Sequence, residues 1–173
     1  MDSTLKDLKE RRSIRKYKAE QIKDSELDAV LEAGTWAANG HGKQSAVMLV
    51  LQNADKIAQL EKLNAAVIGN PEAKPFYGAP TVITVLARKE QPTWVDDGNM
   101  VIANLINAAS AVGIGSCYIY RASAIFDSAE GKALLKEWGL DDGYGGVGHV
   151  ILGYAAENPA PAPRKSGRVI KIR

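Results

Sequence analysis

The sequence lacks the short motifs and residue clusters that mark several common protein classes. Its single cysteine, Cys117, excludes an internal disulfide and a cysteine-cluster metal site, which favours a reducing compartment and a cytoplasmic location. Neither a G-x-x-x-x-G-K-[ST] phosphate loop nor an H-E-x-x-H zinc motif occurs. The G-x-G in AVGIGSC leaves a predicted helix and enters a strand, whereas a dinucleotide-binding fingerprint leaves a strand and opens a helix.

Long hydrophobic runs are also missing. The most apolar stretch, from Met100, carries Asn104, Asn107 and Ser110 and is too short to span a membrane, so we expect a buried helix. The start, MDSTLKDLKERR, has no apolar core of the kind that a signal peptide requires. We therefore expect no association with a membrane.

No acid–base machinery is visible among the side chains. His41 and His149 have no carboxylate partners at ligand spacing, and His149 lies in a strand pattern that favours a structural role with its hydrogen bonds satisfied. Cys117 has no adjacent base and is expected to be a small buried residue. We therefore expect no catalytic side chain and no metal ion, so any demanding chemistry would depend on a cofactor.

Basic residues concentrate at the two ends of the chain, although the net charge is only +2. KERRSIRKYK, residues 9–18, holds six bases, and PAPRK near the other end adds Arg164 and Lys165. A phosphate monoester offers two negative charges and three acceptor oxygens. Arg11, Arg12 and Ser13 could bind one such group while the tail closes over it. A nucleic-acid surface and an ordinary solvated surface are the alternatives.

Strand-like and helical segments alternate along the chain. Helices are expected over residues 3–11, 23–38, 53–67, 97–112 and 127–139, with a capping box formed by Ser25 and Asp28 in the second. Strands are expected over residues 46–51, 81–87, 116–120 and 145–154. The irregular segment lengths favour an α+β layered sheet over a purely parallel sheet.

The tail is predicted to be separate from the body, which gives a single domain over residues 1–156 and a basic arm over 157–173. Prolines at 159, 161 and 163 favour an extended arm, and Val169, Ile170 and Ile172 alternate with bases as in a strand. We expect a homodimer in which this strand adds to the other subunit's sheet, while a frayed terminus is the alternative.

Five segments together resemble the small nitroreductase family, in the same order and over essentially the whole chain. They are RRSIRKY, WAANGHGKQS, FYGAP, NLINAASAVGIGSCYI, and GVGHVILGY followed by PAPRK. The resemblance implies a three-layer fold with a central, mostly antiparallel sheet flanked by helices and a C-terminal arm that extends to the partner subunit. It also implies flavin mononucleotide (FMN) as cofactor and NADH or NADPH as reductant.

The resemblance also implies a role for particular residues. The first motif would place Arg11, Arg12 and Ser13 on the phosphate and ribityl end of FMN and Arg15 near its pyrimidine edge, where a cation stabilises the reduced ring. Further contacts are implied for Asn39, Gly40, His41 and Gln44 from the other subunit, for Asn64, Tyr118, Ile119 and Tyr120 at the ring, and for Arg164 and Lys165 at the phosphate. The sequence departs from the family pattern at Gly42, Ser45 and Ala162.

The remaining aromatic residues have less specific patterns. Phe76 and Tyr77 lie in a loop and are expected to cap the flavin pocket and meet the substrate. Tyr118 and Tyr120 lie in a predicted strand. An equally favoured alternative to contact with the flavin is that they are ordinary core and surface residues of that strand. Trp36 and Trp138 fit helix stripes and are expected to pack rather than to stack on a ring.

The function implied is that of an FMN-dependent NAD(P)H oxidoreductase. The nicotinamide would deliver a hydride to flavin N5 and leave, and a small electron-poor acceptor such as a nitroaromatic or quinone would then be reduced, in a ping-pong scheme. A specialised relative that fragments flavin or removes halogens remains an alternative. A second alternative is a protein that binds a phosphate ligand or nucleic acid and has no redox activity.

Overall fold

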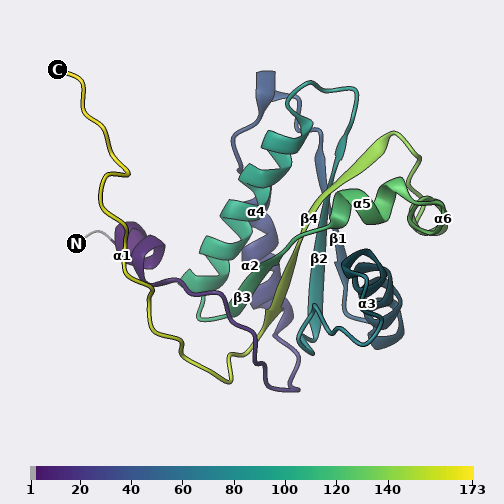
Figure 1. Ribbon diagram of the computed structural model, residues 1–173, viewed down its shortest axis with the longest axis horizontal. Coiled ribbons are helices and arrows are strands. Elements are labelled where there is room, and N and C mark those ends of the chain that lie inside the picture. Colours follow the sequence, from purple (N-terminus) through teal and green to yellow (C-terminus); the bar gives the residue numbers. More distant parts are fainter. Residues whose placement is uncertain (1–2) are drawn as a thin grey trace.

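A four-stranded sheet lies between two layers of helices in the computed structural model, which describes residues 3–173 (Figure 1). All neighbouring strands pair antiparallel, in the order β1-β2-β4-β3, as the family resemblance implied and contrary to the parallel alternative. The strands are β1 (Ala46–Leu51), β2 (Thr81–Arg88), β3 (Gly115–Ile119) and β4 (Tyr144–Gly153). The helices are α1 (Ser3–Glu10), α2 (Asp24–Thr35), η1 (Gly40–Gly42), α3 (Ala54–Ile68), α4 (Trp94–Ala111), α5 (Ala122–Asp127) and α6 (Ala129–Glu137).

The two central strands are buried on both faces. Ile83 and Val85 of β2 pack with α2 and α4, whereas Val82 and Leu86 pack with α3, α5 and α6. Side chains of a strand alternate between its faces, so a strand covered on both sides is apolar at nearly every position. This double burial explains the continuous apolar run TVITVLA.

Two details of the helices differ from the sequence prediction. The capping box of α2 is formed by Lys23 and Glu26, two residues earlier than the predicted pair. The Lys23 backbone N–H donates to Glu26 Oε2 at 2.9 Å. Helix α5 was not predicted; it has only six residues, too few for a hydrophobic period to be recognised. Glycine is required beneath it, since a Cβ at Gly146 would lie 2.4 Å from the Ala122 carbonyl oxygen.

The two tryptophans considered in the sequence differ in their surroundings. Trp138 packs edge-on against Phe126 with ring centroids 6.4 Å apart, as expected of a packing residue. Trp36, at the end of α2, is instead 80% exposed, so its predicted packing role is wrong within this single chain.

The C-terminal segment 157–173 contains no helix or strand and runs past α1 before it projects from the body (Figure 1). Val169, Ile170 and Ile172 are 76%, 85% and 96% exposed. Their strand-like pattern therefore has no partner within the described chain, and strand addition to a second subunit stays a prediction. Among residues 3–173, no helix combines the length and apolar character needed to cross a bilayer.

Candidate active site

The basic N-terminal motif continues the sheet beyond β3. Ser13 forms a parallel bridge with Ser116, and the Ile14 N–H donates to the Ser116 carbonyl at 2.9 Å. Further along, Tyr17 bridges Ala155. An extended segment turns alternate side chains to opposite faces, which separates Ser13 and Arg15 from Ile14.

Three of the predicted FMN ligands act on the buried Cys117 thiol. Burial raises the pKa of this thiol, while the Arg15 cation, the Ser13 hydroxyl and the Arg11 cation each act to lower it. The side chain is 2% exposed, as expected for a small structural residue. The Ser13 hydroxyl and the charges of Arg11 and Arg15 therefore all act on one residue of β3.

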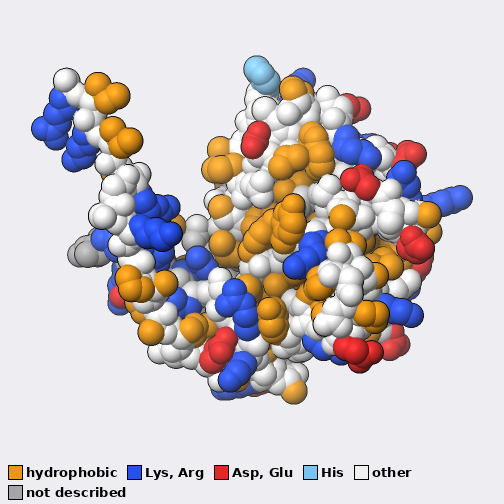
Figure 2. All heavy atoms as spheres, in the orientation of Figure 1, with side chains coloured by type: hydrophobic (Ala, Val, Ile, Leu, Met, Phe, Trp, Pro, Cys, Tyr) orange, Lys and Arg blue, Asp and Glu red, His pale blue; other side chains and the backbone are white. Residues whose placement is uncertain are grey.

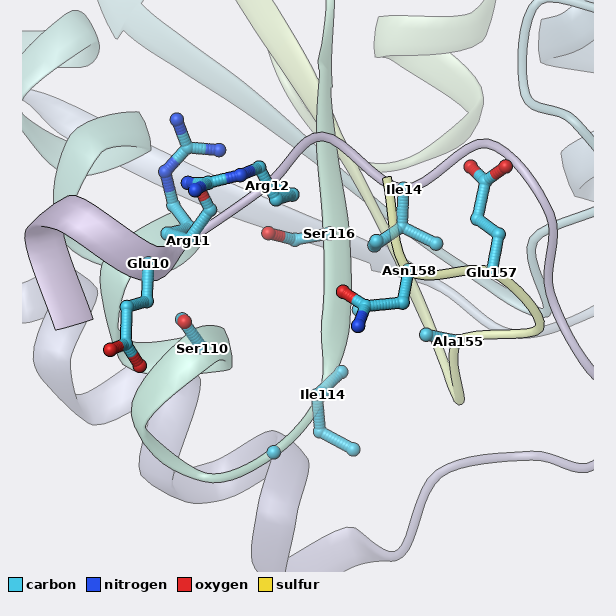
Figure 3. Close-up of a pocket in the computed structure, with 12 residues that line it drawn as sticks. Glu10, Arg11, Arg12, Ile14, Ser110, Ile114, Ser116, Ala155, Glu157 and Asn158 are labelled. Carbon is cyan, nitrogen blue, oxygen red and sulfur yellow. The ribbon is translucent and has the colours of Figure 1, made fainter. Parts of the chain in front are cut away.

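Arg12 is engaged differently from Arg11. Its guanidinium donates to the carbonyls of Lys9 and Arg11, both at 2.8 Å, which satisfies acceptors at the end of α1. Arg11 and Arg12 lie at one end of a cavity of about 310 Å³, and Glu157 lies at the other (Figure 3). Glu157 Oε1 accepts the Arg15 N–H at 2.5 Å, so it fixes the extended segment from this side.

A second cavity, of about 350 Å³, opens beside β3 and contains five of the predicted site residues. It is lined by Arg15, Ile68, Ala73, Lys74, Pro75, Tyr77, Cys117, Tyr118, Ile119, Tyr120 and Arg121. Cofactor sites are typically concave and rich in aromatic and apolar side chains with a few polar groups, and this one has that character. We refer to it below as the β3 cavity.

Phe76 and Tyr77 were both predicted to meet a substrate, but only Tyr77 lines the β3 cavity. Tyr77 is 43% exposed. Phe76 is 1% exposed and packs edge-on against His149, with ring centroids 5.4 Å apart, so the prediction for Phe76 is not met in this chain. Tyr77 adopts a left-handed backbone, with φ at 53°.

Asn64 is fully buried behind the β3 cavity rather than on its surface. Its amide donates to the Tyr120 carbonyl at 3.0 Å, and its oxygen accepts from Arg121 at 3.5 Å. The polar side chain on an apolar helix face, noted in the sequence, thus holds the turn that follows β3. In this chain Asn64 positions residues of the cavity and does not itself face it.

The loop of Asn39, Gly40, His41 and Gln44 precedes β1, at the opposite edge of the sheet from β3. Three strand spacings separate these edges, about 14 Å. The described chain therefore does not bring this loop to the β3 cavity. A second subunit would have to supply it, as the resemblance implies.

Asp97 fixes this loop, although no sequence pattern indicated it. The carboxylate is 4% exposed and accepts from the Gly40 N–H at 2.8 Å and from the Thr93 hydroxyl at 3.0 Å. Asn39 Oδ1 accepts the Gln44 N–H at 2.9 Å. Any side chain at Gly40 would collide with Thr93, since a Cβ would lie 2.3 Å from the threonine hydroxyl.

Backbone strain concentrates in the same segments. Among residues 3–173, the non-glycine residues with positive φ are His41, Gln44, Tyr77 and Arg121. The left-handed conformation costs an L-residue about 1–2 kcal/mol, and such strain is concentrated at functional sites. Three of the four were predicted from the sequence as site residues, and the fourth, Arg121, lines the β3 cavity.

The two tail bases are less closely placed. Arg164 and Lys165 are exposed and line neither the β3 cavity nor the cavity of Arg11 and Arg12. The start of the arm does reach the latter region, where Asn158 and Pro161 form a shallow cavity with Arg12. The tail thus begins beside the N-terminal motif, while its two bases lie farther along.

Within residues 3–173, neither His149 nor a cluster of potential metal ligands lines the two cavities. No group of three or more His, Cys, Asp or Glu side chains in the described part of the chain could hold a metal ion. His149 is fully buried, and burial lowers its pKa to about 3. Its Nδ1 lies 2.9 Å from the Thr84 hydroxyl, while Nε2 has no partner among the described residues, so only half of the expected hydrogen bonding is present.

Residues 8–154 match the model of the family described as "Nitroreductase family". The chain belongs to the nitroreductase family. The match includes every candidate site residue except Arg164 and Lys165, which lie beyond it.

Several solved nitroreductases have the same fold. A nitroreductase from Bacteroides fragilis, crystallised with bound FMN, is 27% identical with a TM-score of 0.91, and the match covers 100% of both chains. One from Desulfitobacterium hafniense, also with bound FMN, is 24% identical with a TM-score of 0.90 over 100% of both chains and supports the fold alone. In sequence, a protein of Archaeoglobus fulgidus named "Putative NADH dehydrogenase/NAD(P)H nitroreductase" is 27% identical over 89% of this chain and 86% of its own length.

Proposed function

We propose that this nitroreductase-family protein is an FMN-dependent NAD(P)H oxidoreductase that reduces small electron-poor acceptors such as nitroaromatics or quinones. Family membership and the FMN-bound B. fragilis relative support the cofactor. The name of the A. fulgidus relative supports the reductant.

The observation that carries the proposal is that Arg11, Ser13 and Arg15 all act on Cys117, a residue that lines the β3 cavity. Two guanidinium groups and a hydroxyl match the charge and the acceptor oxygens of a phosphate-bearing ligand. The tyrosines at 77, 118 and 120 give the adjoining cavity the aromatic surface that a flat ring requires. The residues present therefore fit FMN.

Within this proposal each group has a distinct task. Arg11 and Ser13 hold the phosphate and ribityl end, and Arg15 stabilises negative charge at the pyrimidine edge. Residues 118–120 of the β3 edge support the ring. Arg12 holds the end of α1, and Arg164 and Lys165 add charge at the phosphate when the arm folds back or meets a partner.

The proposed assembly is a homodimer, since the loop of residues 39–44 lies too far from the β3 cavity to complete it within one chain. Asp97 keeps this loop in one conformation, ready for the second subunit's cavity. The exposed Trp36, next to this loop, and the exposed apolar residues of the arm provide surface that dimerisation would bury.

The chain's own contribution to the reaction is binding and orientation. Bound FMN supplies the hydride chemistry that no side chain of the cavity offers. No carboxylate or histidine lines the β3 cavity, and burial raises the pKa of Tyr118, so this phenol stays protonated near neutral pH. Reductant and acceptor compete for the same small cavity, which favours the ping-pong order.

Purification of the recombinant protein followed by absorbance spectroscopy tests the proposal. We expect a yellow protein that contains one FMN per chain and oxidises NADH or NADPH when an acceptor such as a quinone is added. A protein that takes up no FMN from excess cofactor, or that binds it but never oxidises a reduced nicotinamide, would falsify the proposal. Salt-sensitive retention of a colourless protein on DNA would instead favour the nucleic-acid alternative.

A further inference from the structure

The lining of the β3 cavity is positively charged. Arg15, Lys74 and Arg121 all contribute to it, and no aspartate or glutamate does. Lys74 comes from the loop before β2 and Arg121 from the turn after β3, so the three cations reach the cavity from separate segments. Figure 2 shows basic side chains beside hydrophobic surface in the middle of the face where β3 runs in Figure 1.

Lys74 and Arg121 form no ion pair among the described residues. The salt bridges of the described residues join Lys6 to Glu10, Lys56 to Glu137, Arg88 to Asp141, and Lys89 to Asp127. Arg121 instead contacts the neutral amide of Asn64 at 3.5 Å. The Arg15 backbone N–H donates to Glu157, whereas Lys74 is exposed at the cavity and has no salt bridge among the described residues.

Both segments that carry the unpaired cations are held in place. The Tyr77 N–H donates to the Lys74 carbonyl at 3.0 Å, and the next residue back, Phe76, is buried with its N–H donated to Glu61 at 2.8 Å. Arg121 has φ at 85°, a strained conformation at a residue whose side chain is tied to Asn64. A fixed cation loses less conformational entropy on binding than a free one.

We propose that the β3 cavity selects substrates that carry an anionic group, such as a carboxylate, sulfonate or phosphate, next to a planar portion. Lys74 and Arg121 hold the anion, and Tyr77 contacts the planar portion. Arg15 is excluded from this role because the proposed function assigns it to FMN. The inference rests on that function and adds the class of substrate which the same site prefers.

The anionic group could belong to the acceptor or to the phosphates of the reduced nicotinamide. Separate half-reactions distinguish the two sources. In the oxidative half-reaction, the reduced holoenzyme is mixed with 4-nitrobenzoate or with the neutral 4-nitrobenzamide. In the reductive half-reaction, the oxidised holoenzyme is mixed with NADH or with reduced nicotinamide riboside, which carries no phosphate.

We expect the anionic member of one pair to react with a second-order rate constant about five- to tenfold higher, as an attraction of roughly 1 kcal/mol in a partly solvated site predicts. Lys74→Met should reduce that ratio to about twofold or less. Arg121→Met should act in the same direction. Lys132→Gln, which removes one exposed charge from α6 and none from the cavity, should keep the wild-type ratio.

Equal rate constants within both pairs overturn the inference while leaving the proposed function intact, provided that the holoenzyme still turns over. A ratio that persists in both Lys74→Met and Arg121→Met, or that Lys132→Gln lowers as much, also overturns it, because net charge would then be the cause. A protein without FMN overturns the function and the inference together. Selectivity in only one half-reaction supports the inference and identifies the source of the anion.

Discussion

His149 makes the stability of this protein depend on pH in a defined direction. The ring is fully buried, and burial lowers its pKa to about 3, whereas an unfolded chain has a histidine pKa of about 6.5. Below pH 6.5 the unfolded state therefore binds a proton that the folded state excludes. The stability present above pH 6.5 is lost as the pH falls, and linkage gives a loss of about 2 kcal/mol at pH 5 relative to pH 8.

The free energy of unfolding, measured in urea by circular dichroism at pH 5 and pH 8, checks this reasoning. His149→Gln removes the titrating ring, so the pH-dependent loss should shrink by about 2 kcal/mol even if the variant is less stable at both values. His41→Gln, which removes the other, exposed histidine, should leave the loss unchanged. Carboxylates such as Asp141, whose pKa is lowered by Arg88, contribute equally to all three proteins. If wild type and His149→Gln lose the same free energy, burial of a neutral ring is not the cause.

Three further predictions follow from the site and the sheet. Arg11→Ala should weaken FMN binding about ten- to a hundredfold by loss of a charge-assisted hydrogen bond, measured by fluorescence titration, and Arg12→Ala should weaken it less. An equal loss for both would contradict the assignment of Arg12 to the end of α1. Asp97→Asn should reduce the FMN content of the assembled protein. Unchanged FMN content would show that the loop of residues 39–44 does not contribute to cofactor binding. Gly146→Ala should destabilise the fold by about 1–3 kcal/mol in thermal unfolding, because its Cβ would collide with the backbone of α5. An unaltered melting temperature would refute that collision.

The sequence predicted the secondary structure where the hydrophobic period was long enough to read. The run AVMLVL forms β1 at the predicted residues 46–51, and TVITVLA lies within β2. The helix predicted over 53–67 and the strand predicted over 145–154 agree with α3 and β4 within one residue at each end. Helix α5 was missed because six residues carry less than two helical turns, and the cap of α2 was misplaced because its Lys23 resembles no usual capping residue.

The site was only partly predictable because its residues are distant in sequence. The RRS-x-R spacing points to an anion, and the alternation of an extended segment places Ser13 with Arg15. No comparable signal indicated Lys74 or Arg121, since nothing in a local pattern shows that the loop before β2 approaches the turn after β3. The prediction for Phe76 failed for the same reason, because only packing distinguishes it from Tyr77.

Sequence by itself determined the alternation of the longer helices and strands along the chain and the basic motif that suggested a phosphate-bearing cofactor. These properties depend on residue type and short spacing, which a linear chain displays directly. Tertiary structure alone decided which bases share a cavity, that Asn64 and Asp97 support turns from within, and that residues 39–44 lie across the sheet from β3. These positions depend on which strands are neighbours in the sheet and on which side chains are buried. Both depend on contacts between residues far apart in the sequence, which local spacing does not show.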